Sequence, residues 1–156
     1  LRNCPKITIG RVQGKAVGGG VGLAAATDYC MATSYSDIKL SELSIGIGPF
    51  VIEPAVTRKM GISAFSQLSL DPTTFFSAQW AHENGLYMKV LSSKDALNSE
   101  LRAFAEQLTT YNPEALQRLK STLWDGTQHW DELLNTRAAI SGQLVLSEFT
   151  KAQLKK

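Results

Sequence analysis

The chain has 156 residues, of which 44% are hydrophobic and 19% charged, so it is long enough for one domain with a core and too apolar for a disordered segment. Its 16 basic and 14 acidic residues are mixed along the sequence, and the net charge of +2 argues against a nucleic-acid-binding protein, which needs a concentrated basic face. The longest stretch without charge or strong polarity, 16–26, is Gly-rich and too short to span a membrane, and we see no signal peptide. Because the sequence opens with Leu1 and goes straight into a strand-like run, we interpret it as a fragment or a processed chain.

The first ninety or so residues mix strand-like and helix-like runs. Residues 6–12 alternate polar and apolar side chains and predict a strand, and the small-residue run 21–27 predicts a short buried helix. From Val51 on the spacing is helical, with Pro54 tolerated only in a first turn. Three further strands are expected at 28–33, 38–41 and 86–91, and two short helices between 63 and 84, separated by the DPTT turn at 71–74.

The last sixty-odd residues are predicted to be helical throughout. Ser92 and Asp95 match a capping box ahead of apolar residues at helical spacing. The run 112–114 (Asn-Pro-Glu) supplies an N-cap, an N1 proline and a first-turn acid for a second helix. The pair 125–126 (Asp-Gly) predicts a turn, and Asp131 is expected to cap a third helix. Strands mixed with helices, followed by helices alone, indicate an α/β fold with a C-terminal helical region.

Cysteine and histidine usage argues against a disulfide framework and against a metal site. Cys4 and Cys30 lack CxxC spacing, so we expect two reduced, buried thiols, as in a cytosolic protein. His82 and His129 stand in different segments, and neither has a second histidine nearby. We therefore expect no bound metal.

The stretch 14–28, GKAVGGGVGLAAATD, contains five glycines among its fifteen residues. Glycine costs roughly 0.5–1 kcal/mol against alanine inside a regular element, so the cluster indicates that the backbone must approach something closely. A phosphate-binding P-loop is excluded, because Gly20 and Val21 stand where Lys and Ser or Thr are required. A dinucleotide fingerprint fits residues 20–25, with Glu42 about twenty residues on. However, that motif lies seven residues beyond the strand, where its turn should be tight.

An oxyanion hole is the third interpretation of the glycines. A helix that begins just after Gly18, Gly19 and Gly20 would place free first-turn N–H groups and the positive end of the helix dipole there. A carbonyl oxygen that gains negative charge would be held by such an N–H, and glycine permits the approach because it has no Cβ. A glycine turn that lets the helix pack closely on a sheet explains the same residues equally well.

Three segments together resemble one family. VQGKAVGGGVGLAAATD (12–28) followed by IKLSELSIGIGP (38–49) closely resembles the enoyl-CoA hydratase/isomerase, or crotonase, family. SAQWAHENGLYMKVL (77–91) is similar to that family's helix-then-strand segment. Within the family, the chain looks most like a bacterial branch of enoyl-CoA or methylglutaconyl-CoA hydratases. The resemblance implies a crotonase-like α/β spiral, with 1–91 as the C-terminal part of its core and 92–156 as a helical region for oligomerisation and closure of the active site.

The resemblance also implies roles for single residues. Gly19, the middle glycine, would donate one oxyanion N–H to an acyl-CoA thioester, and the second N–H would come from upstream of this chain. Glu42 would be the acid/base carboxylate, with a pKa raised by an apolar pocket. Coenzyme A is part of the substrate, so no separate cofactor is expected. Substrate contacts are expected from Gly18, Gly20, Gly22, Pro49 and Phe50.

Departures from the family pattern leave the reaction open. Gly22 stands where hydratases with two glutamates carry the other one, and the Phe50 ring would narrow the acyl pocket. Glu53 lies nearby, but beside Pro54 at a helix start we interpret it as a first-turn acid. Hydration of a 2-enoyl-CoA, a double-bond shift by a single glutamate, and a degenerate, non-catalytic binding or scaffold protein therefore all stay open.

The helical tail implies partners. In the family it builds trimers, often paired into hexamers, and three apolar residues would serve either that interface or a core within one subunit: Trp124, Trp130 and Leu134. Basic residues near the C-terminus would meet CoA phosphates or stay solvated: Lys151, Lys155 and Lys156. We expect an acyl-CoA thioester as partner, a homotrimer or dimer of trimers, a cytoplasmic location, and neither nucleic acid nor membrane.

Overall fold

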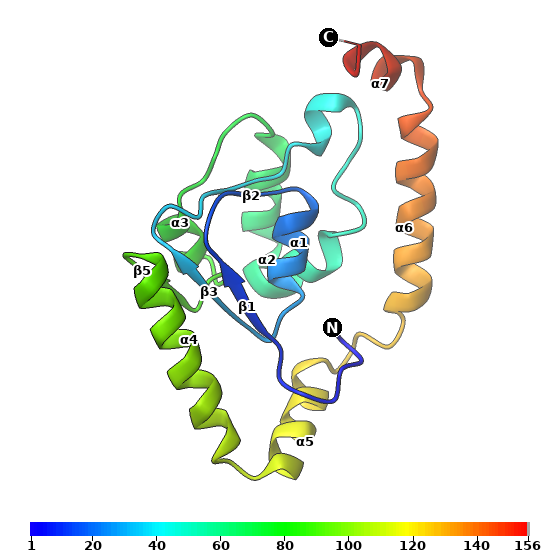
Figure 1. Ribbon diagram of the computed structural model, residues 1–156. Helices are drawn as coiled ribbons and strands as arrows, with labels where there is room; N and C mark the ends of the chain where they lie inside the picture. The colour runs from blue at the N-terminus through cyan, green and yellow to red at the C-terminus, as the bar shows by residue number, and fades with distance from the viewer. Residues whose placement is uncertain (156) are drawn as a thin grey trace.

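A computed structural model describes residues 1–155, and its centre is a three-stranded parallel sheet of order β1-β3-β5 (Figure 1). The strands are β1 (Ile9–Val12), β3 (Tyr29–Thr33) and β5 (Lys89–Leu91). Ile9 pairs with Tyr29 in the β1–β3 register, and Met31 pairs with Lys89 in the β3–β5 register. β3 lies between two neighbours and is buried over four of its five residues, as its apolar sequence requires.

A second, two-stranded parallel sheet positions the candidate site. It pairs β2 (Ala16–Val17) with β4 (Ile38–Lys39), so that Ala16 lies opposite Ile38. An antiparallel bridge between Ile38 and Phe76 extends this sheet on the other side of β4. Both Ala16 and Ile38 are buried in the core, which holds the short strands in place despite their length.

Helices surround the sheets and then continue alone. Those of the first half are α1 (Gly19–Ala25), the 3₁₀ helix η1 (Glu42–Ile45), α2 (Glu53–Leu70) and α3 (Ala78–Glu83). α2 is interrupted at Gly61, whose φ is 77°. The second half contains α4 (Lys94–Thr109), α5 (Pro113–Leu123), α6 (Trp130–Val145) and α7 (Glu148–Gln153). In Figure 1, α6 runs along one side of the molecule and carries α7 at its far end.

Several predicted elements are confirmed. A strand covers 29–33, Pro54 falls in the first turn of α2, and the DPTT turn at 71–74 separates α2 from α3. Asn112 caps α5 through hydrogen bonds that its Oδ1 accepts from the N–H groups of Glu114 and Ala115. Gly126 adopts a positive φ of 76°, as expected of the Asp-Gly turn. The mixed α/β class is the one expected.

Other expectations about element boundaries are wrong for identifiable reasons. α1 begins at Gly19 and not after Gly20, because Gly18 already serves as its N-cap. Ser93 and not Ser92 caps α4, since its Oγ accepts the N–H of Ala96, so Asp95 cannot complete a capping box. Asp131 lies inside the first turn of α6, whose N-cap is His129.

Further differences concern single short elements and the cysteines. β2 and α7 were not anticipated, because two residues and six residues show too little periodicity. Cys30 is buried as expected, whereas Cys4 is half-buried; both are free thiols. In residues 1–155, no helix is long and apolar enough to cross a membrane.

Candidate functional site

The pairing of β2 with β4 brings Gly18 and Glu42 together. Gly18 follows β2 directly and donates its N–H to the carbonyl oxygen of Lys39 at 2.9 Å, and Glu42 begins η1 three residues after Lys39. Gly18 has a φ of 53°, and a Cβ added there would lie 2.7 Å from Oε1 of Glu42. Glycine is therefore required twice at position 18: for the backbone conformation, and for the close approach of the carboxylate.

The carboxylate of Glu42 is poorly partnered. Its Oε2 atom is buried and accepts no hydrogen bond within the described part of the chain. Burial raises the pKa of Glu42 above its ordinary value, and the residue's own N–H offsets this only in part. Neighbouring Leu40 is buried, but Leu43 is 45% exposed. A carboxyl group in this environment holds a proton more readily than one in water, which suits proton transfer.

Gly19, the residue after Gly18, offers a free amide. It is the first residue of α1, where intrahelical acceptors are missing. The N–H groups of Val21 and Gly22 both bond the carbonyl oxygen of Gly18, at 2.9 and 3.3 Å. The N–H of Gly19 has no such acceptor among residues 1–155, and the residue is exposed. This amide is thus available to a ligand oxygen at the positive end of α1.

A largely apolar cavity of about 410 Å³ opens beside Gly19. Its walls come from α1, from the start of α2, from the helical tail and from the N-terminal residues. The lining side chains that are apolar are Leu1, Leu23, Ala26, Val51, Ile52, Ala55, Trp124, Trp130 and Leu134. The backbone of Gly19 and Gly22 completes the α1 wall.

Gly22 is a packing glycine. A Cβ at this position would lie 2.3 Å from Cγ2 and 2.7 Å from Cβ of Ile52. Such distances require Ile52 itself to move, because its branch point and not a flexible end is in the way. A carboxylate side chain at position 22 therefore has no room in this arrangement.

The other predicted site residues lie elsewhere. The cavity beside Gly19 is not lined by Gly18, Gly20, Glu42, Pro49 or Phe50. The Phe50 ring covers Gly48, whose Cβ would fall 2.3 Å from Cζ of that ring. Contact of these predicted residues with substrate stays a prediction. Glu53 begins α2, as expected of a first-turn acid, and its Oε2 lies 3.4 Å from a guanidinium nitrogen of Arg137.

The predicted tail residues divide into two groups. Trp124 and Trp130 are buried within this chain and meet edge to face, with ring centroids 5.8 Å apart. Lys151 forms an exposed ion pair with Glu148 at 2.8 Å, and Lys155 is exposed. Lys156 lies outside the described residues.

Helix α7 covers the loop that follows Glu42. At Gly46, with a φ of 84°, a Cβ would lie 2.5 Å from Cδ1 of Phe149 and 2.7 Å from Oγ1 of Thr150. The C-terminal helix thus packs directly against η1 and its turn. The contact between Gly46 and α7 was not predicted from the sequence, because no local pattern in either segment indicates it.

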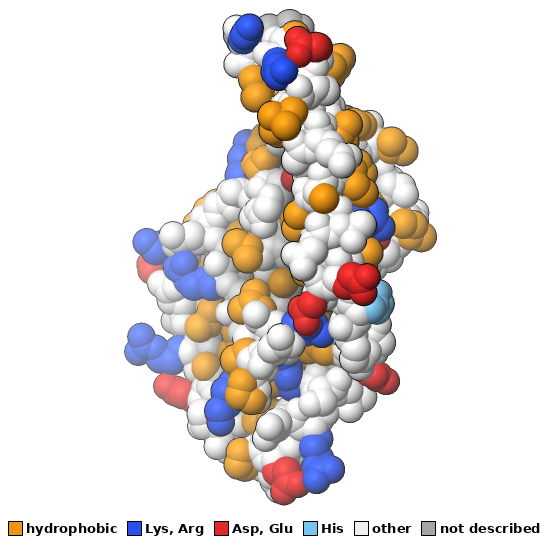
Figure 2. Space-filling view, turned by 90° about the vertical axis from the view of Figure 1, so that its right-hand side faces the viewer, with side chains coloured by type: hydrophobic (Ala, Val, Ile, Leu, Met, Phe, Trp, Pro, Cys, Tyr) orange, Lys and Arg blue, Asp and Glu red, His pale blue; other side chains and the backbone are white. Residues whose placement is uncertain are grey.

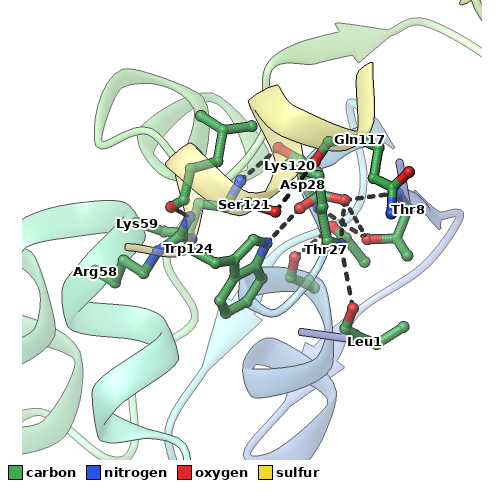
Figure 3. Close-up of polar contacts among 12 residues, drawn as sticks. Leu1, Thr8, Thr27, Asp28, Arg58, Lys59, Gln117, Lys120, Ser121 and Trp124 are labelled. Atoms are coloured by element: carbon green, nitrogen blue, oxygen red, sulfur yellow. Dashed lines mark hydrogen bonds and ion pairs between the residues drawn. The ribbon is translucent and has the colours of Figure 1, made fainter. Parts of the chain in front are cut away.

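A buried polar cluster around Asp28 was also missed (Figure 3). Oδ2 of Asp28 accepts hydrogen bonds from the backbone N–H and the hydroxyl of Thr8 at 2.7 and 2.8 Å, and from Nζ of Lys120 at 2.6 Å. Oδ1 accepts the indole N–H of Trp124 at 2.6 Å. The available signal was a lone acid between two runs of buried residues, because acids in such positions are almost always paired.

The fold and the site define an α/β protein with an unpartnered carboxylate against a glycine turn, and comparison with known proteins identifies the class. The model of the enoyl-CoA hydratase/isomerase family matches residues 1–156. The chain belongs to this family.

Curated relatives in the family carry several activities in their names. The chain is 33% identical to the enoyl-CoA hydratase ACTT6 of Alternaria alternata over 72% of this chain and 37% of that protein. It is 32% identical to the bacillaene synthase dehydratase PksH of Bacillus subtilis, over 77% of this chain and 45% of that one. It is 28% identical to the mitochondrial Delta(3,5)-Delta(2,4)-dienoyl-CoA isomerase of Mus musculus, over 83% and 40%. The chain thus spans less than half the length of these relatives.

Solved structures show the same fold. An enoyl-CoA hydratase from Bacillus halodurans superimposes with a TM-score of 0.90 over 99% of this chain and 62% of its own, at 20% identity. An enoyl-CoA hydratase from Mycobacterium avium subsp. paratuberculosis gives the same TM-score at 22% identity, over 99% of this chain and 64% of its own.

Proposed function

We propose that this chain supplies the acid/base carboxylate and one oxyanion donor of an enzyme that adds water to a 2-enoyl-CoA thioester. The observation that carries the proposal is the carboxylate of Glu42, which has a raised pKa and a buried, unpartnered oxygen against the glycine turn that ends in the free amide of Gly19. Relatives named enoyl-CoA hydratase support the choice of reaction.

In the proposed reaction the amide of Gly19 donates to the thioester oxygen. Polarisation of that carbonyl draws electrons from the C2–C3 double bond, so that C3 accepts a hydroxyl group and the oxygen carries enolate charge. Glu42 removes the proton from the attacking water and returns one to C2, which restores the thioester. One carboxylate serves both transfers, because Ile52 fills the space beside Gly22.

A double-bond shift is the second candidate, and the packing of Ile52 on Gly22 is the observation that favours it. A shift from a 3-enoyl to a 2-enoyl thioester needs only one carboxylate, which removes a proton from C2 and delivers it to C4. It needs no bound water. A relative named as a dienoyl-CoA isomerase is in keeping with this alternative.

Two substrates distinguish the candidates in the full-length protein that carries this chain. A hydratase consumes the enoyl-thioester absorbance of crotonyl-CoA, whereas an isomerase creates that absorbance from a 3-enoyl-CoA. A protein that binds both thioesters and changes neither is the degenerate scaffold and contradicts the proposal. A fluorescence titration tests whether the protein binds NADH. Binding would restore the interpretation of residues 20–25 as a dinucleotide fingerprint.

The same proposal includes a homotrimer or a dimer of trimers, in the cytoplasm. Its support is the apolar surface of α6 and α7, where Val145, Leu146, Phe149 and Leu154 are 40–68% exposed. Figure 2 shows hydrophobic side chains spread along this side of the molecule. Several exposed apolar side chains on adjoining helices support a protein–protein contact there. Sedimentation of the full-length protein tests the assembly, and a monomer at micromolar concentration would contradict it.

A further inference from the structure

The turn that carries Glu42 has little hold on the core by itself. None of the four residues of η1 is fully buried, and no side chain in residues 1–155 caps its start. Leu43, the residue after Glu42, is 45% exposed. Because hydrogen-bond geometry in a short 3₁₀ helix is poorer than in an α-helix, η1 depends on its neighbours for its place in the fold.

The turn is nevertheless tied together internally. The N–H of Gly46 donates to the carbonyl oxygens of both Glu42 and Leu43, and the N–H of Ile47 donates to that of Glu42 at 3.1 Å. The backbone from Glu42 to Ile47 is therefore a closed unit. A contact made at Gly46 fixes the backbone of Glu42 as well.

Thr150 of α7 makes such a contact (Figure 1). The residue is fully buried, and a Cβ added to Gly46 would lie 2.7 Å from its Oγ1. The same Oγ1 accepts a hydrogen bond at 3.2 Å from the hydroxyl of Ser147, which also caps α7. The Phe149 ring lies beside the same glycine, with Cδ1 2.5 Å from that Cβ position. α7 thus rests on the bare backbone of the turn.

We propose that Thr150 is a positioning residue for proton transfer, which holds the η1 turn and thereby keeps the carboxylate of Glu42 against Gly18. The inference rests on the proposed function of Glu42, because Thr150 acts through that carboxylate and touches no reacting atom. Close positioning matters here, since a displacement of about 1 Å in a catalytic group can cost on the order of 10²-fold in rate.

Burial is the main influence on the carboxyl group that the turn carries. Burial raises the pKa of Glu42, and the residue's own N–H opposes it. If the turn moves away from Gly18, the carboxyl becomes better hydrated and its pKa falls towards the ordinary value of 4.5. α1 carries no ionisable side chain, and those of β4, of the first turn of α2 and of α7 are engaged elsewhere: Lys39 with the Phe75 ring, Glu53 with Arg137, and Glu148 with Lys151.

The test compares T150A with T150S in the full-length protein, with whichever enoyl-CoA the wild type converts. T150A opens space beside Gly46, so kcat should fall about tenfold or more with little change in KM. The acidic midpoint of the plot of kcat/KM against pH should move to lower pH, because the pKa of Glu42 falls. T150S keeps the Oγ1 atom and its bond with Ser147, so kcat should stay within about twofold of the wild-type value.

F149A is the second variant. It removes the other contact at Gly46 and should move kcat and the acidic midpoint in the same directions as T150A. It serves if T150A does not fold, since Phe149 is 59% exposed and its truncation leaves no cavity in the core.

T127A is the matched control, because Thr127 is another buried threonine of the helical tail. It is 5% exposed, and its Oγ1 donates to the carbonyl oxygen of Trp124 at 2.7 Å, away from η1. T127A should keep the wild-type kcat and the wild-type midpoint. An equal loss of kcat in T127A would overturn the role of Thr150, and so would an unchanged midpoint in both T150A and F149A.

Failure of the proposed function is a separate outcome. If the wild type converts no enoyl thioester, the proposed function fails, and an NMR titration of the ¹³C-labelled carboxyl group of Glu42 still decides the role of Thr150. A pKa of Glu42 that is lower in T150A than in wild type and T127A supports the positioning of that carboxylate by Thr150. The same pKa in all three proteins overturns it.

Discussion

Asp28 and Glu42 each bury carboxylate oxygens near the sheets, and they differ in how those oxygens are partnered. Oδ1 and Oδ2 of Asp28 together accept hydrogen bonds from Thr8, Lys120 and Trp124. Oε2 of Glu42 accepts none from residues 1–155. The first carboxylate has its acceptor capacity filled by the protein, whereas the second keeps capacity for something else.

The pKa values move in opposite directions for this reason. Burial alone would raise the pKa of Asp28, but hydrogen bonds from Lys120, Thr8 and Trp124 outweigh burial and lower it. At Glu42 burial raises the pKa, and only the residue's own N–H opposes it. A carboxylate that the fold keeps ionised stabilises structure, whereas one that the fold makes easier to protonate is suited to proton transfer.

The largest expected effect is on catalysis. E42Q should lower kcat by about 10²–10⁴-fold with little change in KM, because the amide cannot exchange a proton but keeps the shape of the side chain. E53Q is the matched control, since Glu53 is an acid of the same size that faces Arg137 at 3.4 Å. Steady-state kinetics of both variants, with whichever enoyl-CoA the wild type converts, measures kcat and KM. An equal loss of kcat in E53Q would mean that Glu42 has no special role in proton transfer.

Removing the partner of Asp28 should affect stability instead. K120M leaves the Asp28 carboxylate buried without its cation, and the free energy of unfolding should fall by about 3–5 kcal/mol. K151M, which breaks the exposed pair with Glu148, should cost no more than about 1 kcal/mol. Urea unfolding followed by circular dichroism measures both. Similar losses in the two variants would show that burial does not distinguish the pairs.

The packing of Gly22 gives a smaller effect. G22A should lower the free energy of unfolding by about 1–3 kcal/mol, since its Cβ meets the branch point of Ile52. G142A is the control in another helix: a Cβ there meets nothing within 4 Å, so the variant should gain about 0.5–1 kcal/mol. Thermal unfolding of both compares them directly. A neutral G22A would mean that Ile52 yields easily and that a second carboxylate at position 22 would fit.

Sequence reasoning reached Glu42 and Gly19 through the family's motifs, and it reached the helical tail through caps such as Asn112. It did not reach the contact between Gly18 and Glu42, which depends on pairing of β2 with β4. A two-residue strand beside glycines has no readable periodicity. The approach of the Glu42 carboxylate to the backbone of Gly18 can be seen only in the tertiary structure.

Long-range contacts account for the rest of what was missed. Asp28 and Trp124 are 96 residues apart, and no local pattern links a strand start to the end of α5. Trp124 and Trp130 fitted an interface or an internal core equally well from their sequence, and the structure buries both within one chain. What decides between such alternatives is which surface the tail folds onto, and that is a property of the whole chain.

The smallest expected effect is the pH dependence of stability, and it has opposite signs at the two carboxylates. The lowered pKa of Asp28 means that its stabilisation is present above about pH 3.8 and is lost as pH falls through its folded value. The raised pKa of Glu42 means that stability is full below its unfolded value of 4.5 and declines as pH rises through the folded value. E42Q lacks that decline.

The difference in Tm between E42Q and wild type should therefore grow in favour of E42Q as the pH rises from about 4.5 through the folded pKa of Glu42. Below about pH 4 both proteins should lose stability together, because both keep Asp28. Scanning calorimetry across this range measures the two branches in one experiment. A Tm difference that does not change with pH would mean that the fold does not disfavour the ionised form of Glu42, and the physical ground for assigning proton transfer to that residue would be removed.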